Sequence, residues 1–290
     1  MRSGPVKWSA VAASCVVVAL FASAVFVSCG PDPGYREGQY VIRCELQRSG
    51  WFDPIVYPGQ TFVGHLHEFY GGNIDPNSTS EQLSSDPATT CADDGEPSDR
   101  ASYWHPTVLI DGLRAPLTDF RVYYTEGRKH NAEIRDLPRG LKMIGDRHDW
   151  GCGKGSGLSG QPSPPQCPST SDGLSFHVYL PSCWNGRDLD SSDHRSHMAY
   201  PVQLDEDDAR ECPDTHPVPL PALIYRGKTG RWPAPSQVSL SSGAPDTMHV
   251  DYFDGWAGDR QTVLNDACIR GTDADGPTKC TKLDREGLPQ

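Results

Sequence analysis

Short stretches of alternating apolar and polar residues recur along the chain. Each of the clearest ones is rich in β-branched or aromatic residues and is bounded by Gly, Pro, Asp or Ser, which is the pattern of a short β-strand between turns. Eight stretches are predicted to be strands: 39–46, 60–67, 107–110, 120–124, 176–180, 222–225, 237–240 and 249–253.

This pattern predicts a mainly β fold. Long apolar repeats of helical period are absent, and 29 glycines and 26 prolines supply frequent turns. The amphipathic stretches that repeated β–α–β units need are missing as well. We therefore expect a single β-sandwich or jelly-roll-like domain over residues 39–281, with long loops clipped by disulfides. The Gly-, Ser- and Pro-rich residues 151–173 are one such loop.

The N-terminal stretch changes the expected compartment. Two basic residues, Arg2 and Lys7, precede an apolar run that carries no charge from residue 8 to residue 27. Small residues near the end of this run suit cleavage, so residues 1–28 are predicted to be a signal peptide. The run is close to the roughly 20 residues of a membrane span, and an uncleaved anchor is the alternative.

The end of this leader also predicts a lipid. The sequence Phe26-Val27-Ser28-Cys29-Gly30 resembles a bacterial lipobox, in which the cysteine becomes the lipidated first residue. We therefore expect a secreted protein, attached to the outer face of the membrane through a lipid on Cys29. Residues 29–38 are predicted to be a linker, and residues 282–290 a flexible tail.

The cysteine count favours disulfides. Leaving out Cys15 and Cys29 gives an even count of eight with no C-x-x-C pair, which argues against a zinc ribbon or a thioredoxin-like site. An oxidising compartment makes disulfides the natural use. Local pairs are the easiest to close and leave one remaining pair, so the hypothesis is Cys152–Cys167, Cys183–Cys212, Cys268–Cys280 and Cys44–Cys91.

The charge of the chain argues against one class of partner. The formal net charge is −12 at pH 7. No basic segment is concentrated enough to follow a phosphate backbone, so we expect no binding to nucleic acid.

Histidines are the most informative polar residues. On a strand His65 and His67 would share a face, as would His249 and Asp251, because side chains alternate. His194 and His197, three positions apart, could converge on a helical turn. The candidate metal ligands are His65, His67 and His197, and the candidate catalytic residues are Asp193, His194, His249 and Asp251.

Three uses of such a set stay open. It could bind Zn2+ or another divalent metal, with a position left for water. It could run acid–base chemistry without a metal, with Asp193 as a base and His249 orienting Asp251. It could also be a buried hydrogen-bond network that fixes irregular loops.

Aromatic residues and carboxylates point to sugars. Trp184 and Trp256 lie beside polar turns, where an aromatic face can stack on a sugar ring while amides and carboxylates meet its hydroxyl groups. The alternative is that these large residues anchor a small core. No G-x-S-x-G, H-E-x-x-H or P-loop motif occurs, so a serine hydrolase or a zincin has no local support.

Several segments together resemble a known family. They occur in this order over about residues 40–270: Asp53-Pro54-Ile55-Val56, His65-Leu66-His67, Thr89-Thr90-Cys91, Tyr103-Trp104-His105-Pro106, Pro181-Ser182-Cys183-Trp184-Asn185-Gly186, Asp193-His194-Arg195-Ser196-His197, Cys212-Pro213 and His249-Val250-Asp251-Tyr252-Phe253. The combination resembles a secreted domain-of-unknown-function family of fungi and actinobacteria, found in fungi beside WSC cell-wall modules. The resemblance implies an extracellular, cell-wall-associated role and supports the choice of histidines, but it implies no particular reaction.

Together these observations predict a carbohydrate-active domain of the cell envelope. Its partner would be a cell-wall or environmental glycan, hydrolysed or bound by a His/Asp cluster that holds a divalent metal. The alternatives are a non-catalytic glycan-binding or wall-anchoring domain and a metal-binding lipoprotein.

Overall fold

Two antiparallel sheets make up most of the fold in a computed structural model, which describes residues 38–91, 96–127, 133–153, 161–203, 210–270 and 279–280. The predicted signal peptide, Cys29, most of the linker and the tail lie outside the described residues. The first sheet has six strands in the order β19 (Lys279–Cys280), β1 (Gln39–Arg43), β7 (Asp119–Thr125), β16 (Ala222–Lys228), β10 (Leu174–Tyr179) and β9 (Arg147–Cys152). Only the β19–β1 pair in it is parallel.

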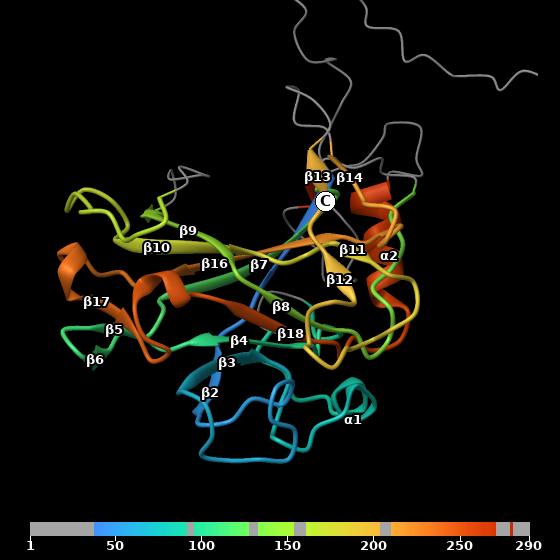
Figure 1. The fold of residues 1–290 in the computed structure, drawn as a ribbon, viewed down its shortest axis with the longest axis horizontal. Coiled ribbons are helices and arrows are strands. Elements are labelled where there is room, and N and C mark those ends of the chain that lie inside the picture. The colour runs from blue at the N-terminus through green and yellow to red at the C-terminus, as the bar shows by residue number, and fades with distance from the viewer. Residues whose placement is uncertain are drawn as a thin grey trace, which may run out of the picture. The chain divides into compact units, whose positions relative to one another are not determined.

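The second sheet has five strands in the order β2 (Leu46–Gly50), β3 (His67–Gly71), β4 (Ser102–Pro106), β18 (Val250–Phe253) and β8 (Lys142–Gly145). Figure 1 shows the two sheets as layers, with β7, β10 and β16 in one and β3, β4 and β18 in the other.

Three smaller sheets and a few helical turns complete the described structure. In the first, β5 (Val108–Ile110) lies between β17 (Val238–Leu240) and β6 (Leu113–Arg114). In the second, β11 (Cys183–Trp184) lies between β12 (Met198–Ala199) and β15 (Val218–Pro219). The third pairs β13 (Val202–Gln203) with β14 (Arg210–Glu211). The helical segments are α1 (Ser80–Ser85), α2 (Arg260–Asn265), the π-helical η6 (Asp266–Arg270) and the 3-10 turns η4 (Pro235–Gln237) and η5 (Pro245–Thr247).

The main core lies between the two sheets. In β7 the even-numbered residues Phe120, Val122 and Tyr124 are buried, as alternation on a strand requires. Aromatic rings then join the layers: Tyr70 of β3 stacks on Phe120 with centroids 4.1 Å apart, and Tyr103 of β4 meets Tyr225 of β16 at 5.6 Å. The expected mainly β, sandwich-like fold is confirmed.

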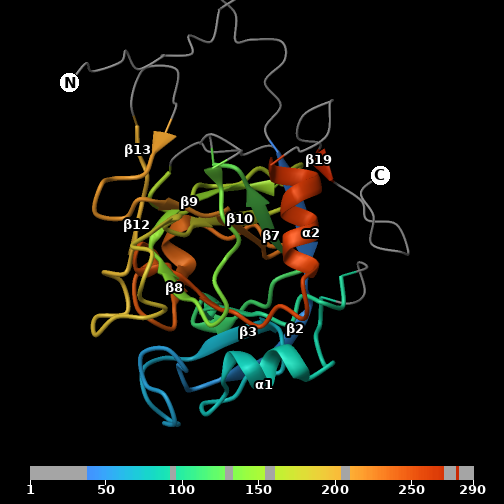
Figure 2. The same cartoon turned by 90° about the vertical axis from the view of Figure 1, so that its right-hand side faces the viewer.

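A second apolar cluster covers the other face of the five-stranded sheet. Phe52 stacks on Phe69 at 4.3 Å, and the cluster is completed by Ile55, Ile74, Leu83, Trp104, Ile144 and Phe253. Leu83 belongs to α1, and Phe52 and Ile55 belong to the segment before β3. In Figures 1 and 2, α1 and this segment lie below β3. This sheet is therefore buried on both faces.

All four predicted disulfides are confirmed: Cys44–Cys91, Cys152–Cys167, Cys183–Cys212 and Cys268–Cys280. They are compatible with an extracellular protein. Among the described residues, no helix is long and apolar enough to cross a membrane.

One predicted strand is wrong. Residues 60–66 form an irregular loop and the strand begins only at His67. The physical reason is that Phe62 and Gly64 have φ angles of 60° and 70°, a left-handed conformation that interrupts an extended chain. The segment around His194 and His197 is likewise a series of turns rather than a helix, and His194 has a φ of 58°.

Candidate metal centre

A pocket of about 190 Å3 opens on the outer face of the five-stranded sheet, where the loop 51–66 approaches β3 and β18. Its walls carry an unusual density of ionisable side chains. They are Asp53, Val56, Tyr57, Gly64, His65, His67, Ile144, Arg195, His249 and Asp251.

His67, the first residue of β3, is fixed most firmly. Its ring is buried, and its Nδ1–H donates to the carbonyl oxygen of Phe52 at 2.9 Å. This bond sets the tautomer, so Nε2 carries the lone pair. Nε2 is itself buried and has no hydrogen-bond partner. The ring therefore presents a free ligand atom whose orientation is fixed from behind.

His249 is held in the same way. It precedes β18, and its Nδ1–H donates to the carbonyl oxygen of Thr247 at 2.9 Å. Its Nε2 lies 3.8 Å from a carboxylate oxygen of Asp251. Burial lowers the pKa of His249 to about 4, so the imidazole is neutral at neutral pH.

His65, in the loop before β3, is the third histidine of the group. Its ring centroid lies 4.2 Å from that of His67 and 5.1 Å from that of His249. The preceding Gly64 adopts a φ of 70°, which L-residues with a side chain avoid, and this turn leads the chain into the pocket. Like His67, His65 has a buried Nε2 without a hydrogen-bond partner.

One nitrogen from each of His65, His67 and His249 lies within 4.8 Å of the other two. Ligand nitrogens of a tetrahedral Zn2+ stand about 3.4 Å apart, given Zn–N bonds of about 2.0–2.1 Å. A bound ion would draw the three nitrogens closer together. The set therefore fits a three-histidine metal site.

Two carboxylates extend this set. Asp251 is 1% exposed, and neither of its oxygens has a hydrogen-bond partner. Asp53 is also buried, but its Oδ1 accepts the backbone N–H groups of Ile55 and Val56. Together with His67, the two aspartates make a second group whose ligand atoms lie within 4.8 Å of one another. A cation between the imidazoles and Asp251 would give these oxygens the partner they lack.

The electrostatics of the pocket favour this role. Burial lowers the pKa of His65 and lowers that of His67 further, with the neighbouring His65 as the next cause. Burial also raises the pKa of Asp251 well above its usual value, and the charge of Asp53 adds to this. Neutral imidazoles are the metal-binding form. Two buried aspartates close together gain most from a divalent cation, because it offsets their burial and their mutual repulsion.

Not every predicted residue lies here. His65, His67, His249 and Asp251 line this one pocket, although His65 lies on a loop and not on the predicted strand. His197 lies elsewhere: its ring contacts the hydroxyl of Ser191 at 3.0 Å and the carbonyl oxygen of Lys142 at 2.7 Å.

Asp193 and His194 belong to the same turn segment as His197. Asp193 accepts the backbone N–H groups of Arg195 and Ser196, which lowers its pKa. The Nδ1 of His194 contacts Asp190 at 2.9 Å. From this segment Arg195 reaches the pocket wall, and its guanidinium pairs with Asp146 at 2.9 Å.

Sequence reasoning missed Asp53, Tyr57 and Arg195 as pocket residues. They reach the pocket through loop geometry, which has no periodic signal. The sequence Asp-Pro-Ile-Val at 53–56 did carry a local signal. An aspartate side chain often accepts a hydrogen bond from the backbone N–H two residues later, and this forms a turn. A third close group, Cys44, Cys91 and Asp99, is not a metal site because both cysteines form a disulfide.

The comparisons with known proteins place the chain in a family. No curated protein and no solved structure matches it. The family model described as Domain of unknown function (DUF1996) matches residues 53–256, a span that contains every donor of the pocket and covers more than half of the 290 residues. The chain belongs to the DUF1996 family.

Proposed function

We propose that this domain binds a divalent metal, Zn2+ in the first instance, at His65, His67 and His249, and uses the site to hydrolyse an extracellular or cell-envelope glycan. The observation that carries the metal site is the set of buried donor atoms without partners. It comprises Nε2 of His65, Nε2 of His67 and both oxygens of Asp251, all from residues that line one pocket.

The side chains of the pocket would have separate roles in metal binding and in proton transfer. Three imidazoles hold the ion, and the hydrogen bonds to the carbonyl groups of Phe52 and Thr247 keep two of them in position. Asp251 is placed to complete the coordination or to take a proton from a bound water. When bound, a divalent ion would act as a Lewis acid and lower the pKa of water toward neutrality.

Exposed aromatic side chains support a glycan as the substrate. Tyr57 lines the pocket and is 40% exposed. Trp51 and Phe62, on the same loop, are 50% and 87% exposed, and the N–H of Phe62 donates to the carbonyl oxygen of Trp51 at 2.6 Å. Exposed aromatic faces beside a polar site suit the stacking of sugar rings.

The first test is metal content. Protein purified without added metals or chelators is compared with the His65→Ala/His67→Ala variant and with His216→Ala. His216 is a matched control because its Nε2 contacts the carbonyl oxygen of Ser196, outside the pocket. We expect near-stoichiometric metal in the wild type and in His216→Ala, and loss in the double variant with the fold intact by circular dichroism. Absence of metal even after incubation with zinc, manganese and copper would reject the site.

The second test is turnover. Metal-loaded wild type is screened for new reducing ends on cell-wall and environmental glycans, beside metal-free protein and Asp251→Ala. Hydrolysis that requires both the metal and Asp251 is the expected result. Activity unchanged in both comparisons would show that the chemistry lies elsewhere.

One observation favours a second candidate, glycan binding without turnover. The pocket, at about 190 Å3, is smaller than the roughly 300–1,000 Å3 typical of ligand sites. Binding alone predicts saturable retention on a glycan without product, and retention that survives removal of the metal. Loss of retention in a Trp51→Ala/Phe62→Ala variant would locate it on the exposed aromatic residues.

A further inference from the structure

A second polar cluster lies on the outer face of the six-stranded sheet, away from the aromatic core. Arg43 of β1, Arg121 of β7 and Arg226 of β16 stand directly opposite one another in the strand register. Lys228, two residues after Arg226, extends from the same face. We call these four residues the cationic row. Like charges directly opposite on neighbouring strands destabilise a sheet, so the row needs negative charge to offset it.

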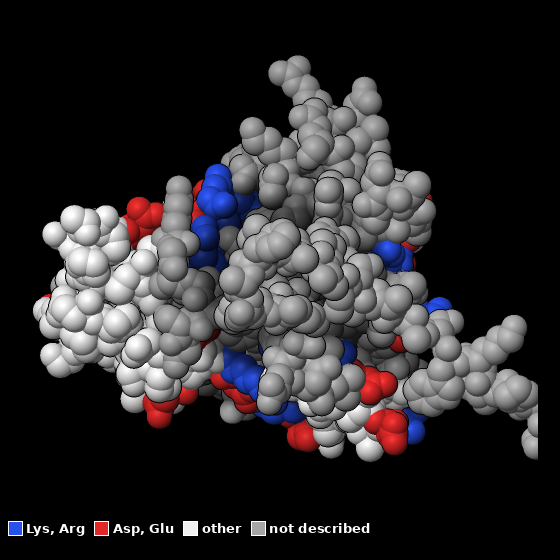
Figure 3. Space-filling model, turned by 90° about the horizontal axis from the view of Figure 1, so that it is seen from above, with Lys and Arg blue, Asp and Glu red and all other residues white. Residues whose placement is uncertain are grey.

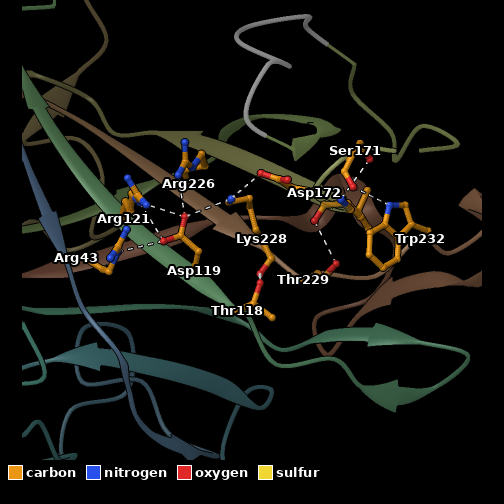
Figure 4. A network of polar contacts seen from close by, with 12 residues as sticks. Arg43, Thr118, Asp119, Arg121, Ser171, Asp172, Arg226, Lys228, Thr229 and Trp232 are labelled. Carbon is orange, nitrogen blue, oxygen red and sulfur yellow. Dashed lines mark hydrogen bonds and ion pairs between the residues drawn. The ribbon is translucent and has the colours of Figure 1, made fainter. Parts of the chain in front are cut away.

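One carboxylate lies at the centre of the row (Figure 4). The oxygens of Asp119 lie 2.9 Å from Arg121 Nε and 2.7 Å from Arg226 Nη2. They also lie 3.2 Å from Arg43 Nε and 3.7 Å from Lys228 Nζ. Burial would raise the pKa of Asp119, but the hydrogen bonds from the arginines outweigh it and lower that pKa. Asp119 is therefore a carboxylate shared among four cations.

A second acid contacts one end of the row. Asp172 lies 3.3 Å from Lys228 Nζ, is about half exposed, and contacts only this end of the row. Among the described residues, Asp119 and Asp172 are the acids that pair with Lys228. Figure 3, which views the molecule from above Figure 1, shows Lys and Arg atoms beside Asp and Glu atoms on this side.

Arg226 gives an independent sign of an absent partner. It is 9% exposed, and its buried Nε has no hydrogen-bond acceptor among the described residues. Its guanidinium carbon lies 5.7 Å from the ring centroid of Tyr123, which offsets part of the cost of burial. A buried charged donor without an acceptor costs more than a neutral one, so an acceptor at this place would stabilise the fold.

The row is open to a ligand at one end. The side chains of Arg43 and Arg121 are 38% and 27% exposed, whereas those of Arg226 and Lys228 are 11% and 9% exposed. Arginine offers five N–H donors in a planar fork, and Asp119 engages a single nitrogen of Arg121 and of Arg226. Several guanidinium groups on one side suit an anion with three or more oxygens better than a single carboxylate.

We propose that the cationic row binds a phosphate-type oxyanion on the outer face of the six-stranded sheet. The ligand is inorganic phosphate or a phosphate group carried by a larger molecule, and sulfate shares the geometry. The two sources share one chemistry and are separated by experiment. This site lies on a different sheet from the metal pocket and does not depend on the proposed hydrolytic function.

Calorimetric titration of the full-length protein with sodium phosphate, at fixed ionic strength, tests the site. Arg121→Gln removes one exposed arginine of the row. Arg187→Gln is the matched control, since Arg187 is exposed and pairs only with Asp188 among the described residues. We expect saturable binding by the wild type and by Arg187→Gln, and affinity about tenfold or more weaker in Arg121→Gln. No binding by the wild type, or equal weakening in both variants, would overturn the proposal.

A third variant separates a ligand site from a purely structural network. Asp119→Asn removes the carboxylate that competes with the ligand, so its phosphate affinity should rise while its melting temperature without phosphate falls. Phosphate should then raise the melting temperature more in Asp119→Asn than in the wild type. A variant that phosphate does not stabilise would contradict the site. If Arg121→Gln fails to fold, Arg43→Gln replaces it in the titration.

Two further arms identify the source of the phosphate. If a phosphate-bearing polysaccharide displaces bound inorganic phosphate and a neutral polysaccharide does not, the natural ligand is a phosphate group on a polymer. Competition by vesicles of anionic phospholipid, with zwitterionic vesicles as control, would assign a lipid headgroup. If neither competes, free phosphate is the ligand and the proposal stands.

Discussion

Asp251 lies on β18 with both carboxylate oxygens buried and without a hydrogen-bond partner. Such a group destabilises the metal-free fold but strengthens cation binding, because a buried charge gains most from a nearby opposite charge. The alternation rule predicted that His249 and Asp251 share a face, and they do, at 3.8 Å. It said nothing about Asp53, whose position depends on how a loop folds back over the sheet.

Asp251→Asn should therefore change stability and metal affinity in opposite directions. Without metal, its free energy of unfolding should rise by about 1 kcal/mol or more, because a buried carboxylate becomes a neutral amide. Its affinity for zinc should fall about 10–100-fold. Urea unfolding after chelation gives the first quantity, and competition with a zinc indicator gives the second. If the metal-free variant is less stable than the metal-free wild type, the claim that the Asp251 carboxylate destabilises the metal-free fold is wrong.

Asp99 gives a pH dependence of known sign. Burial raises its pKa well above the usual value, although Tyr103 Oη donates to its carboxylate at 2.5 Å. In the range between the unfolded and the folded pKa the native state binds more protons, so its stability falls as pH rises. We expect the unfolding free energy to decline above about pH 4, and to decline less steeply in Asp99→Asn.

Asp193 provides the control of opposite sign for that measurement. Backbone N–H groups lower its pKa, so its contribution to stability is present above the unfolded pKa and is lost as pH falls. Asp193→Asn should leave the decline above pH 4 unchanged. Urea titrations at a series of pH values compare the three proteins, and equal slopes for Asp99→Asn and wild type would reject the assignment to Asp99.

At the scale of elements, the strands with one buried face were predictable. β1, β7 and β17, whose burial alternates along the strand, overlap predicted stretches. β4 was missed: all five of its residues are buried, and a strand covered on both faces loses the alternating pattern. Burial alone does not decide the outcome, since β18 is also fully buried and overlaps a predicted stretch. The loop 60–66 was mistaken for a strand, so His65 and His67 do come together, but through the turn at Gly64 rather than through alternation on one strand.

Gly64→Ala tests that turn. A Cβ at Gly64 would meet no atom closer than 3.6 Å, so the cost is the φ of 70° rather than a clash. We expect a loss of about 1 kcal/mol of stability together with weaker zinc binding, because His65 is displaced. Gly112→Ala is the control: its φ is 73°, a Cβ there meets nothing within 4 Å, and it lies in the β5–β6 turn. It should lose similar stability but keep zinc affinity, and equal zinc affinity in both variants would show that the turn does not position His65.

At the scale of the whole molecule, the sandwich class and the disulfide map were predictable, and the packing of the sheets was not. Cysteine spacing identified all four bridges because every one joins neighbours in the cysteine order. No local pattern showed that the five-stranded sheet carries apolar clusters on both faces. That arrangement depends on contacts between distant segments, such as Phe52 with Phe69 and Tyr103 with Tyr225.

The bridges should contribute unequally to stability. Cys44–Cys91 spans 47 residues and Cys268–Cys280 spans 12. Loop-closure entropy predicts that replacing the first pair by alanine costs about 4 kcal/mol and the second about 3 kcal/mol. Urea unfolding of the two double variants checks the order. A larger loss for Cys268–Cys280 would mean that native contacts near the C-terminal bridge outweigh chain entropy.

The four bridges also follow one another along the chain without overlap, since residues 44–91, 152–167, 183–212 and 268–280 are separate intervals. A protease cut inside any interval therefore leaves one covalent molecule, and a cut between intervals releases two. Electrophoresis of a partial digest with and without reductant distinguishes the two kinds of cut. This order of bridges therefore lets the domain be cut once inside each of four intervals and still remain one covalent molecule.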